Sequence, residues 1–340
     1  MSIEWRRPSV WGRAFALACV SVLGVAGIVG SGGGSLGFPP CTGSFCGNNN
    51  PPPPPVPSAS IRPPYLTVQV GMPVSYSAET ANVSGSLSYQ WRRSSDGGRS
   101  YVDIAGATGQ TYSLPSVNLG DDGAVFRVDV RTATEGTLPA LSHLAVSASP
   151  GVVFADGEFA PADWLSSPVP DPDQKAFVHT EERVATGGNP DAYRKMSFQI
   201  PQGAGAARLF YRSATAIYYP AAQGTIHVID YAEDCIALQT STTTYTMSSL
   251  VIEQNGRRYL SNTSDICTAT TWSGVATRAS LTAQDFRFVD GPVCASGESC
   301  PDFSVSAPPL RFGYWRIVFG APGDLVAHGI DNWKVTVWRR

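Results

Sequence analysis

The chain has 340 residues, a length that suggests two domains of ordinary size. It contains 34 glycines and 27 prolines, and only 15% of its residues are charged, a balance that favours an all-β, loop-rich protein over a helical one. The formal net charge of -3 gives no electrostatic argument for a nucleic-acid partner or for an anionic membrane surface.

The first thirty residues, 1–30, have the pattern of an export signal. Arg6, Arg7 and Arg13 precede the uncharged run 14–30, which ends in small residues. A basic start, an apolar middle and a small-residue end are typical of a cleaved secretory signal. The run is close to the shortest segment that crosses a bilayer. The alternative is therefore an N-terminal anchor that is not cleaved, and only in that case do we expect the chain to contact the membrane.

Residues 31–60 contain no hydrophobic period and are dominated by glycine, asparagine and proline. This composition predicts a linker that is partly stiffened by polyproline. It would hold the folded part of the chain away from the cell envelope.

Six cysteines follow the signal, and an even number in an exported chain favours disulfides, with fifteen arithmetically possible pairings. Short loops close at a low entropic cost, so the spacing favours 41–46 and 294–300 and leaves 235–267. The absence of a CxxC motif and of a nearby histidine cluster argues against a zinc site. The predicted pairs are Cys41–Cys46, Cys235–Cys267 and Cys294–Cys300.

Residues 61–148 contain short strand-like runs such as "YLTVQV", "LSYQWRR" and "AVFRVDVRT", with turn signals between them. Such spacing predicts a β-sandwich. The stretches "LSYQWRRSSDGG", "IAGATGQTYSLPSV" and "DDGAVFRVDV" resemble bacterial immunoglobulin-like domains over nearly the whole segment. The resemblance implies that Trp91 is the core tryptophan of the third strand and not a sugar-stacking ring. The usual core cysteines are absent, and Val128 stands near one of their positions, so this core is expected to hold without a bridge.

Residues 149–340 are again rich in strand-like runs, among them "YRKMSFQI", "TIHVIDYA" and "FGYWRIVFG", and show no amphipathic helix of ten or more residues. Asn255 and Gly256 lie between two apolar stretches and predict a type I′ hairpin, because both central residues of that turn need positive φ. The pattern predicts a second, larger sandwich of the jelly-roll or concanavalin-like type.

Three stretches of this domain, "FADGEFAPADW", "GGNPDAYRKMSF" and "HGIDNWKVTV", resemble the jelly rolls of carbohydrate-binding modules and concanavalin-like lectins. In those families an opening acid, a glycine-rich turn and a closing aspartate meet around a structural calcium ion. The first and last strands of a sandwich commonly lie side by side, so we expect "FADGE" and "GIDNW" to meet. The resemblance implies calcium ligands from Asp331 and Glu158, with Asp156, and from backbone oxygens near Gly188 and Asn189.

Asp331 also raises a question by itself. In a strand over 330–338, strict alternation places it on the face of Trp333, Val335 and Val337, which is the expected core face. An ionised carboxylate in an apolar layer is costly unless it is paired or bound to a cation. A structural Ca²⁺ ion is one explanation, and an arginine partner or a position at the surface end of the strand is the other.

Aromatic side chains are the natural candidates for sugar binding, because the CH faces of sugars stack on aromatic rings. Tyr218 and Tyr219 are consecutive, so one of them is expected to point outward from a strand. Trp272 lies in a polar, loop-like run near Cys267. These three residues are the predicted ligand-binding residues, and the alternative for Trp272 is a loop residue that caps the edge of the core.

Catalytic patterns are weak. The ExDxxE pattern that concanavalin-like glycosidases need is absent, as are GxSxG and P-loop motifs. The segment "IDYAED" brings Asp230, Glu233 and Asp234 close in sequence, but acids of this kind are usually solvated. We therefore assign no catalytic residue.

The sequence thus predicts an exported, non-catalytic binding protein in the periplasm, at the cell surface or outside the cell. An immunoglobulin-like spacer would present a lectin-like domain for attachment to a glycan or matrix component of the bacterial cell envelope. The alternatives are a glycoside-active enzyme with a degenerate site and a purely structural or protein-interaction module. Two facing carboxylates in a deep groove would favour the enzyme, and a shallow aromatic patch on a sheet face would favour the lectin.

Overall fold

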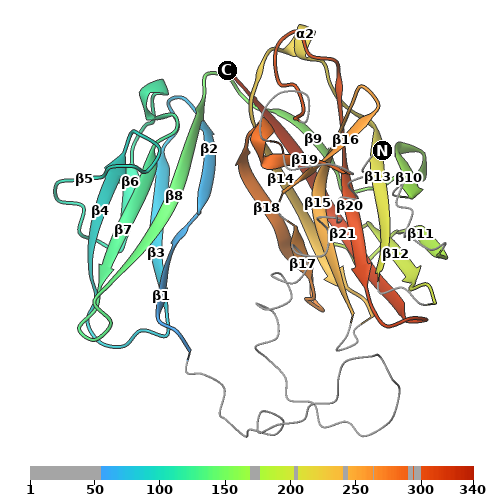
Figure 1. Cartoon of the computed structure of the whole chain (residues 1–340), viewed down its shortest axis with the longest axis horizontal. Helices are drawn as coiled ribbons and strands as arrows, with labels where there is room; N and C mark the ends of the chain where they lie inside the picture. The colour runs from blue at the N-terminus through green and yellow to red at the C-terminus, as the bar shows by residue number, and fades with distance from the viewer. Residues whose placement is uncertain are drawn as a thin grey trace, which may run out of the picture. The chain divides into compact units, whose positions relative to one another are not determined.

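The computed structural model describes residues 55–168, 177–202, 206–239, 244–262, 264–289, 294 and 300–340. Within these ranges the chain is nearly all β-structure, which confirms the predicted all-β class, and the single α-helix is the four-residue α2 (Pro220–Gln223) (Figure 1). None of the described helices is long and apolar enough to cross a membrane. The predicted signal, most of the linker and the Cys41–Cys46 pair lie outside the described residues.

The first sandwich consists of a three-stranded and a five-stranded sheet, in which β2 runs parallel to β8 and the other pairs are antiparallel. The first sheet has the order β1 (Ser58–Arg62), β3 (Val74–Ala81), β6 (Thr111–Leu114). The second has the order β2 (Tyr65–Gln69), β8 (Thr137–Ser147), β7 (Val125–Arg131), β4 (Ser88–Ser94), β5 (Val102–Asp103). A 3-10 turn, η1 (Leu119–Asp121), precedes β7.

The core of the first sandwich is built around Trp91, which is fully buried. Its ring contacts those of Tyr76 and Tyr112, and its Nε1 donates a hydrogen bond to the Gly109 carbonyl at 2.9 Å. Val128 is also fully buried. Trp91 is therefore a core residue, and aromatic packing fills the space between the two sheets.

The second sandwich has one larger sheet, here called the β20 sheet, and one facing sheet, here called the β21 sheet. The β20 sheet has the order β10 (Trp164–Pro168), β13 (Ala206–Tyr218), β20 (Leu310–Phe319), β15 (Tyr245–Gln254), β16 (Arg257–Ser261), β19 (Phe286–Phe288), with β17 (Asp265–Cys267) beside β15. The β21 sheet has the order β11 (His179–Val184), β12 (Tyr193–Gln199), β21 (Leu325–Arg339), β14 (Ile226–Ala237), β18 (Ser273–Leu281), with β9 (Val152–Asp156) beside β21. The 3-10 turns are η2 (Pro161–Asp163) and η3 (Ala283–Asp285).

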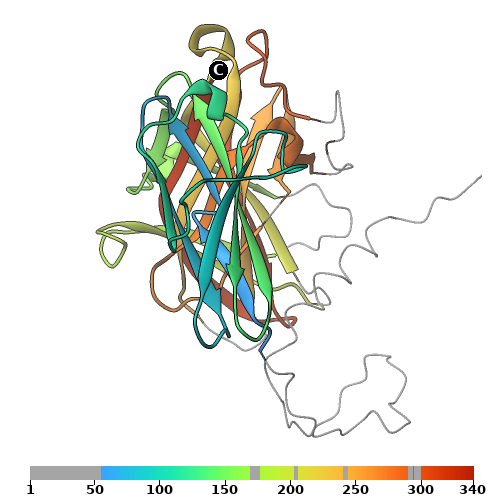
Figure 2. The same cartoon turned by 90° about the vertical axis from the view of Figure 1, so that its left-hand side faces the viewer.

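The main core of the chain lies between these two sheets. Trp333, Val335 and Val337 project into it from β21, and Phe312 and Tyr314 project into it from β20. Burying a large aromatic or aliphatic side chain contributes about 1.5–3 kcal/mol, so this layer dominates the stability of the second sandwich. Figure 2 shows the strands of the chain from the side.

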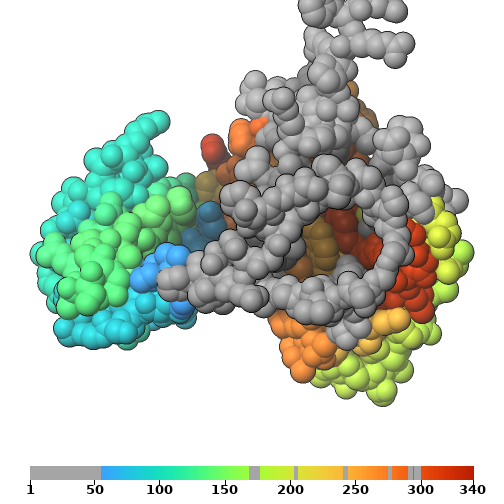
Figure 3. Space-filling model, turned by 60° about the horizontal axis from the view of Figure 1, so that its bottom comes forward, coloured from blue at the N-terminus to red at the C-terminus, as the bar shows by residue number. Residues whose placement is uncertain are grey.

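The two ends of the second sandwich meet in the β21 sheet. Asp156 of β9 lies opposite Trp333 of β21, which confirms the expectation that "FADGE" and "GIDNW" are neighbours. Strand β12 pairs with the preceding stretch of β21 along the same edge as β9, and β14 pairs with β21 along the opposite edge. The space-filling view shows red C-terminal residues beside yellow-green ones (Figure 3). The predicted hairpin is also present, because β15 and β16 are joined by Asn255 and Gly256 with φ of 51° and 75°.

Among the described residues two disulfides are present: Cys294–Cys300, which the spacing favours, and Cys235–Cys267, the pair that the spacing leaves. Cys235 is on β14 of the β21 sheet, and Cys267 is on β17 of the β20 sheet. This bond therefore joins the two sheets of the second sandwich.

Candidate functional site

Strand β21 does not keep strict alternation at Asp331. Asn332 has a φ of 49°, and between Asp331 and Lys334 strand β21 holds one residue more than its partner β14, so the strand contains a β-bulge. Ile330 and Trp333 both face the core as a result. The expectation that Asp331 lies in line with the apolar stripe is wrong, because the bulge moves its side chain to the opposite face of the sheet.

Asp331 is nevertheless buried, with an exposed fraction of 1%. Its Oδ2 accepts a hydrogen bond from the backbone N–H of Asn189 at 2.5 Å, and its Oδ1 accepts one from Asn332 at 2.7 Å. Gly188 allows this approach, since a Cβ there would lie 2.7 Å from Oδ2 and 2.5 Å from the Ala192 carbonyl. The partners of the carboxylate are thus backbone amides and not the arginine that was one alternative.

A second carboxylate, Asp234, joins this group and was not assigned to it from the sequence. Its Oδ2 accepts hydrogen bonds from the side-chain amides of Asn189 at 3.0 Å and Asn332 at 2.7 Å. Burial raises the pKa of Asp331, the two backbone hydrogen bonds oppose that shift, and the charges of Asp234 and Glu158 add to it. We call Asp331, Asp234, Asn189 and Asn332 the Asp331 cluster.

The other predicted calcium ligands have local partners. Both oxygens of Asp156 are engaged, Oδ1 by the N–H groups of Glu158 and Phe159 at 2.8 Å and Oδ2 by Nε1 of Trp164 at 2.6 Å. Glu158 forms an ion pair with Arg183. Among the described residues, no group of three or more His, Cys, Asp or Glu side chains is placed to hold a metal ion.

The three predicted ligand-binding aromatics do not come together. Tyr218 is fully buried and donates its hydroxyl to the Gly224 carbonyl at 2.8 Å, whereas Tyr219 is 49% exposed beside α2. Trp272 is half-buried and donates Nε1 to the Gly187 carbonyl at 2.7 Å. The tyrosines lie near the start of β14 and Trp272 near its end, which are about 30 Å apart at the usual rise of a strand.

The three acids of "IDYAED" also have separate surroundings. Asp230 Oδ1 accepts hydrogen bonds from the Thr67 hydroxyl at 2.8 Å and the Ser280 N–H at 2.7 Å, so it links β2 of the first sandwich to the second. Glu233 points into the core, and Asp234 belongs to the Asp331 cluster. Alternation along β14 places Glu233 on the core face and Asp230 and Asp234 on the outer face, where they are four residues apart and bind different partners.

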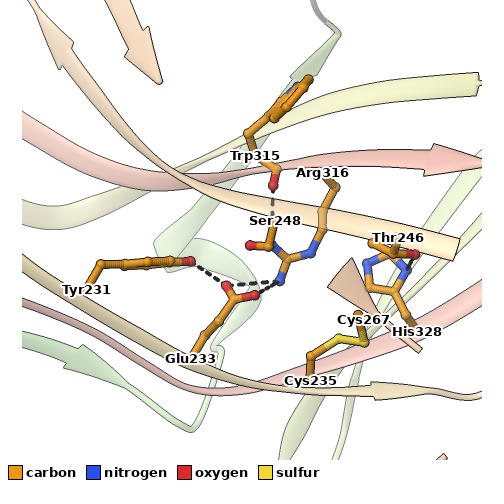
Figure 4. The surroundings of a disulfide bond; sticks show 9 residues. All are labelled: Tyr231, Glu233, Cys235, Thr246, Ser248, Cys267, Trp315, Arg316 and His328. Carbon is orange, nitrogen blue, oxygen red and sulfur yellow. Dashed lines mark hydrogen bonds and ion pairs between the residues drawn. A yellow bond between two sulfur atoms is a disulfide. The ribbon is translucent and has the colours of Figure 1, made fainter. Parts of the chain in front are cut away.

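A buried ion pair lies beside the inter-sheet disulfide. Figure 4 shows the side chains of Glu233 and Arg316 pointing toward one another, with Nη2 of Arg316 3.0 and 3.1 Å from the two carboxylate oxygens. Tyr231 donates its hydroxyl to Glu233, and the Arg316 guanidinium lies 4.5 Å from the ring centre of Tyr314. Ser248 accepts a further hydrogen bond from Arg316. The pair connects β14 of one sheet to β20 of the other, and no local sequence pattern indicates it.

The outer face of the β20 sheet carries an apolar cluster that is separate from the main core. Phe210, Val251, Leu260, Trp315 and Ile317 form it, and each alternates with residues that face the other sheet. The sequence does not distinguish this face, because apolar residues lie on both sides of β20.

A hollow of about 110 Å³ opens on this face beside Gly313. Strand pairing places Arg212 and Val251 on either side of Gly313, and the glycine has no side chain to fill the space between them. A Cβ at Gly313 would lie 2.0 Å from the Tyr211 carbonyl, so only glycine permits the close approach of β13 and β20 here. The register of β13 shifts directly after Arg212.

Charged side chains surround the hollow. Glu253 accepts a hydrogen bond from Nη1 of Arg212 at 2.9 Å, and Nε of Arg258 lies 3.6 Å from its other oxygen. The Arg258 guanidinium is 4.8 Å from the ring centre of Phe210. Arg311 also lines the hollow and donates a hydrogen bond to a backbone carbonyl on β13. The arrangement combines planar hydrogen-bond donors, one acceptor and an apolar floor.

Comparison with known proteins finds no matching family model and no matching curated protein. Part of the chain is similar to the N-terminal four Ig domains of Dscam1 isoform 6.9, with 24% identity over 26% of this chain and 20% of that one and a TM-score of 0.21. A marsupial T cell receptor is 13% identical over 46% of this chain and 94% of that one, with a TM-score of 0.23. The chain spans about a fifth of the Dscam1 structure. These similarities are too limited to assign a family or a role, so the function has to be argued from the chain's own residues.

Proposed function

We propose that this chain is an exported, non-catalytic binding protein that attaches to a glycan through the outer face of the β20 sheet. The hollow beside Gly313 carries the proposal. Binding sites of this kind combine an apolar floor with a few well-placed polar groups, here Arg212, Arg258 and Glu253 over Phe210. Guanidinium and carboxylate groups offer the planar donors and acceptors that sugar hydroxyls need.

Two further observations support a non-catalytic, exported role. Glu253 is the single carboxylate among the described residues that line the hollow, whereas glycoside hydrolysis ordinarily uses a pair. The two disulfides fit maturation in an oxidising compartment outside the cytosol. An envelope or matrix polysaccharide is the partner that this setting favours.

Replacing Arg258 by alanine should weaken binding to polysaccharide about tenfold, because the change removes a charge-assisted hydrogen-bond donor from the edge of the hollow. Affinity electrophoresis of the full chain through gels that contain a panel of polysaccharides measures this. Lys195→Ala is the matched control, because Lys195 is a cation on the other sheet that pairs with Glu182. If no polysaccharide retards the unaltered chain, the structural or protein-interaction role replaces this proposal.

We also propose a structural calcium ion at the Asp331 cluster. The cluster suits a cation, because two carboxylates that repel one another are bridged by two asparagine amides. The partially positive NH₂ groups of Asn189 and Asn332 occupy the place that a cation would take beside the carboxylates. Rotation of either side-chain amide by 180° would turn its oxygen toward that place, where the oxygen could bind a calcium ion. Asp156 does not suit this role, because both of its oxygens hold the turn after β9.

Chelation by EDTA should lower the melting temperature of the full chain by about 5–10 °C. A calcium ion at about a hundred times its dissociation constant stabilises the folded state by about 2.7 kcal/mol. For a domain of this size, that free energy corresponds to the stated shift in melting temperature. Asp331→Asn should remove the sensitivity to EDTA, and Glu79→Gln on the first sandwich should keep it. Unchanged melting of the unaltered chain after chelation would show that no calcium is bound.

A further inference from the structure

We propose that the ligand of the β20 sheet is an acidic polysaccharide. This inference rests on the proposed function and specifies the chemical class of the ligand. It arises from the distribution of charge over the outer face of the sheet, which differs from that of the whole chain.

The outward positions can be assigned from alternation and strand register. Phe210, Val251 and Trp315 face outward, so residues two positions away along each strand do so as well. Arginine occupies five of the outward positions across the sheet, and Glu253 is the single acid among the described outward positions. The five arginines are Arg208, Arg212, Arg258, Arg287 and Arg311. Among the described outward positions, positive charges therefore outnumber negative ones by four, in a chain whose net charge is -3.

Two of these arginines lie at the two ends of a row of paired residues that crosses the sheet. Register places Arg212, Gly313, Val251, Leu260 and Arg287 side by side on five consecutive strands. With strands about 4.8 Å apart, the row from Arg212 to Arg287 is about 19 Å long, which suits a polymer better than a single sugar.

The surroundings of Arg287 favour an anionic ligand at this end of the row. Burial lowers the pKa of its guanidinium, and no carboxylate in the described part of the chain opposes that shift. Its neighbour across the strands is the apolar Leu260. A cation that is partly withdrawn from water beside apolar groups gains more from an anionic ligand than an exposed one does.

A polysaccharide suits the face better than a nucleic acid does. Proteins that bind single strands present aromatic rings on which bases stack, but here Phe210 is 2% exposed and covered by Arg258, and Trp315 is 8% exposed. The face therefore offers guanidinium groups, which bind carboxylate and sulfate oxygens with paired hydrogen bonds.

Two matched pairs of polymers test the proposal on the full chain. Polygalacturonate and its methyl ester share one backbone and differ in charge, and chondroitin sulfate and its desulfated form differ in their sulfate groups. We expect the more acidic member of at least one pair to bind about tenfold more tightly, with an affinity that falls as salt is added. Arg287→Gln should weaken that binding about tenfold, whereas Arg62→Gln, which alters an exposed arginine of the first sandwich, should not.

The outcomes separate this inference from the proposed function. Equal binding within both pairs would overturn the acidic class and leave glycan binding in place. No binding of any polymer, neutral polysaccharides included, would overturn both. Duplex or single-stranded DNA that binds at least as tightly as the acidic polysaccharides at the same salt would overturn the inference in favour of nucleic acid.

Discussion

Replacing Glu233 by alanine is expected to destabilise the chain by about 3–5 kcal/mol, because it leaves the Arg316 charge buried without a partner. Both side chains are fully buried, so water cannot replace the lost carboxylate. Tyr231 would also lose the acceptor of its hydroxyl. Urea unfolding of the Glu233→Ala variant, followed by fluorescence, measures the loss.

The expected size of this effect depends on how Arg316 is enclosed. Arg194, Tyr211, Tyr314 and Arg316 form a stack in which each guanidinium lies over a tyrosine ring, at 5.1 and 4.5 Å, and the two rings are 4.6 Å apart. The stack leaves Arg316 no route to solvent. Burial raises the pKa of the Tyr314 hydroxyl, so that ring stays neutral between the two cations.

A double variant distinguishes an unpaired charge from a general packing defect. Glu233→Leu combined with Arg316→Met removes both charges and should recover most of the stability lost on changing Glu233 alone. Glu79→Ala serves as the control, because its ion pair with Arg62 is exposed and should contribute less than about 1 kcal/mol. A double variant as unstable as the single one would show that packing, and not charge, accounts for the loss.

Local patterns predicted much of this fold, because the features concerned depend on neighbours in sequence. The all-β class and the hairpin at Asn255 and Gly256 follow from alternation and turn chemistry. The burial of Trp91 was instead implied by the resemblance to immunoglobulin-like domains. The pairing of β9 with β21 followed from a resemblance, since no local pattern joins the two ends of a domain.

Features that depend on register between distant strands were not predictable. One additional residue at Asn332 reversed the face on which Asp331 lies, and no sequence pattern marks such a bulge. Arg212 and Arg287 share a row only because their two strands and the three strands between them are in matching register. Glu233 and Arg316 are 83 residues apart and come from opposite sheets. The candidate site was therefore found from the structure and not from the aromatic residues that the sequence singled out.

Replacing both Cys235 and Cys267 by alanine is expected to cost about 3.7 kcal/mol of unfolding free energy. The bond closes a loop between residues 32 positions apart, and the cost follows from the entropy that the open loop returns to the unfolded chain. The bond also connects β14 to β17, and thus one sheet to the other. Urea unfolding under identical buffer conditions measures the difference from the unaltered chain.

The second disulfide provides a matched control. Cys294 and Cys300 are six positions apart, so the same relation gives about 2.2 kcal/mol for their replacement by alanine. The longer loop should therefore cost about 1.5 kcal/mol more than the shorter one. Equal losses for the two pairs, or a larger loss for the short loop, would show that loop entropy does not set the contribution of these bonds.

Combining the two changes on β14 tests whether the disulfide and the ion pair act as one connection between the sheets. Glu233 is two residues from Cys235, and both side chains bridge to the facing sheet. Sites this close commonly show interaction energies of about 0.5–3 kcal/mol. We expect the combined variant to lose less than the sum of the separate losses, because once either connection is gone the sheets separate at this end and the other connection is already weakened. Strict additivity within error would show that each connection holds the sheets independently.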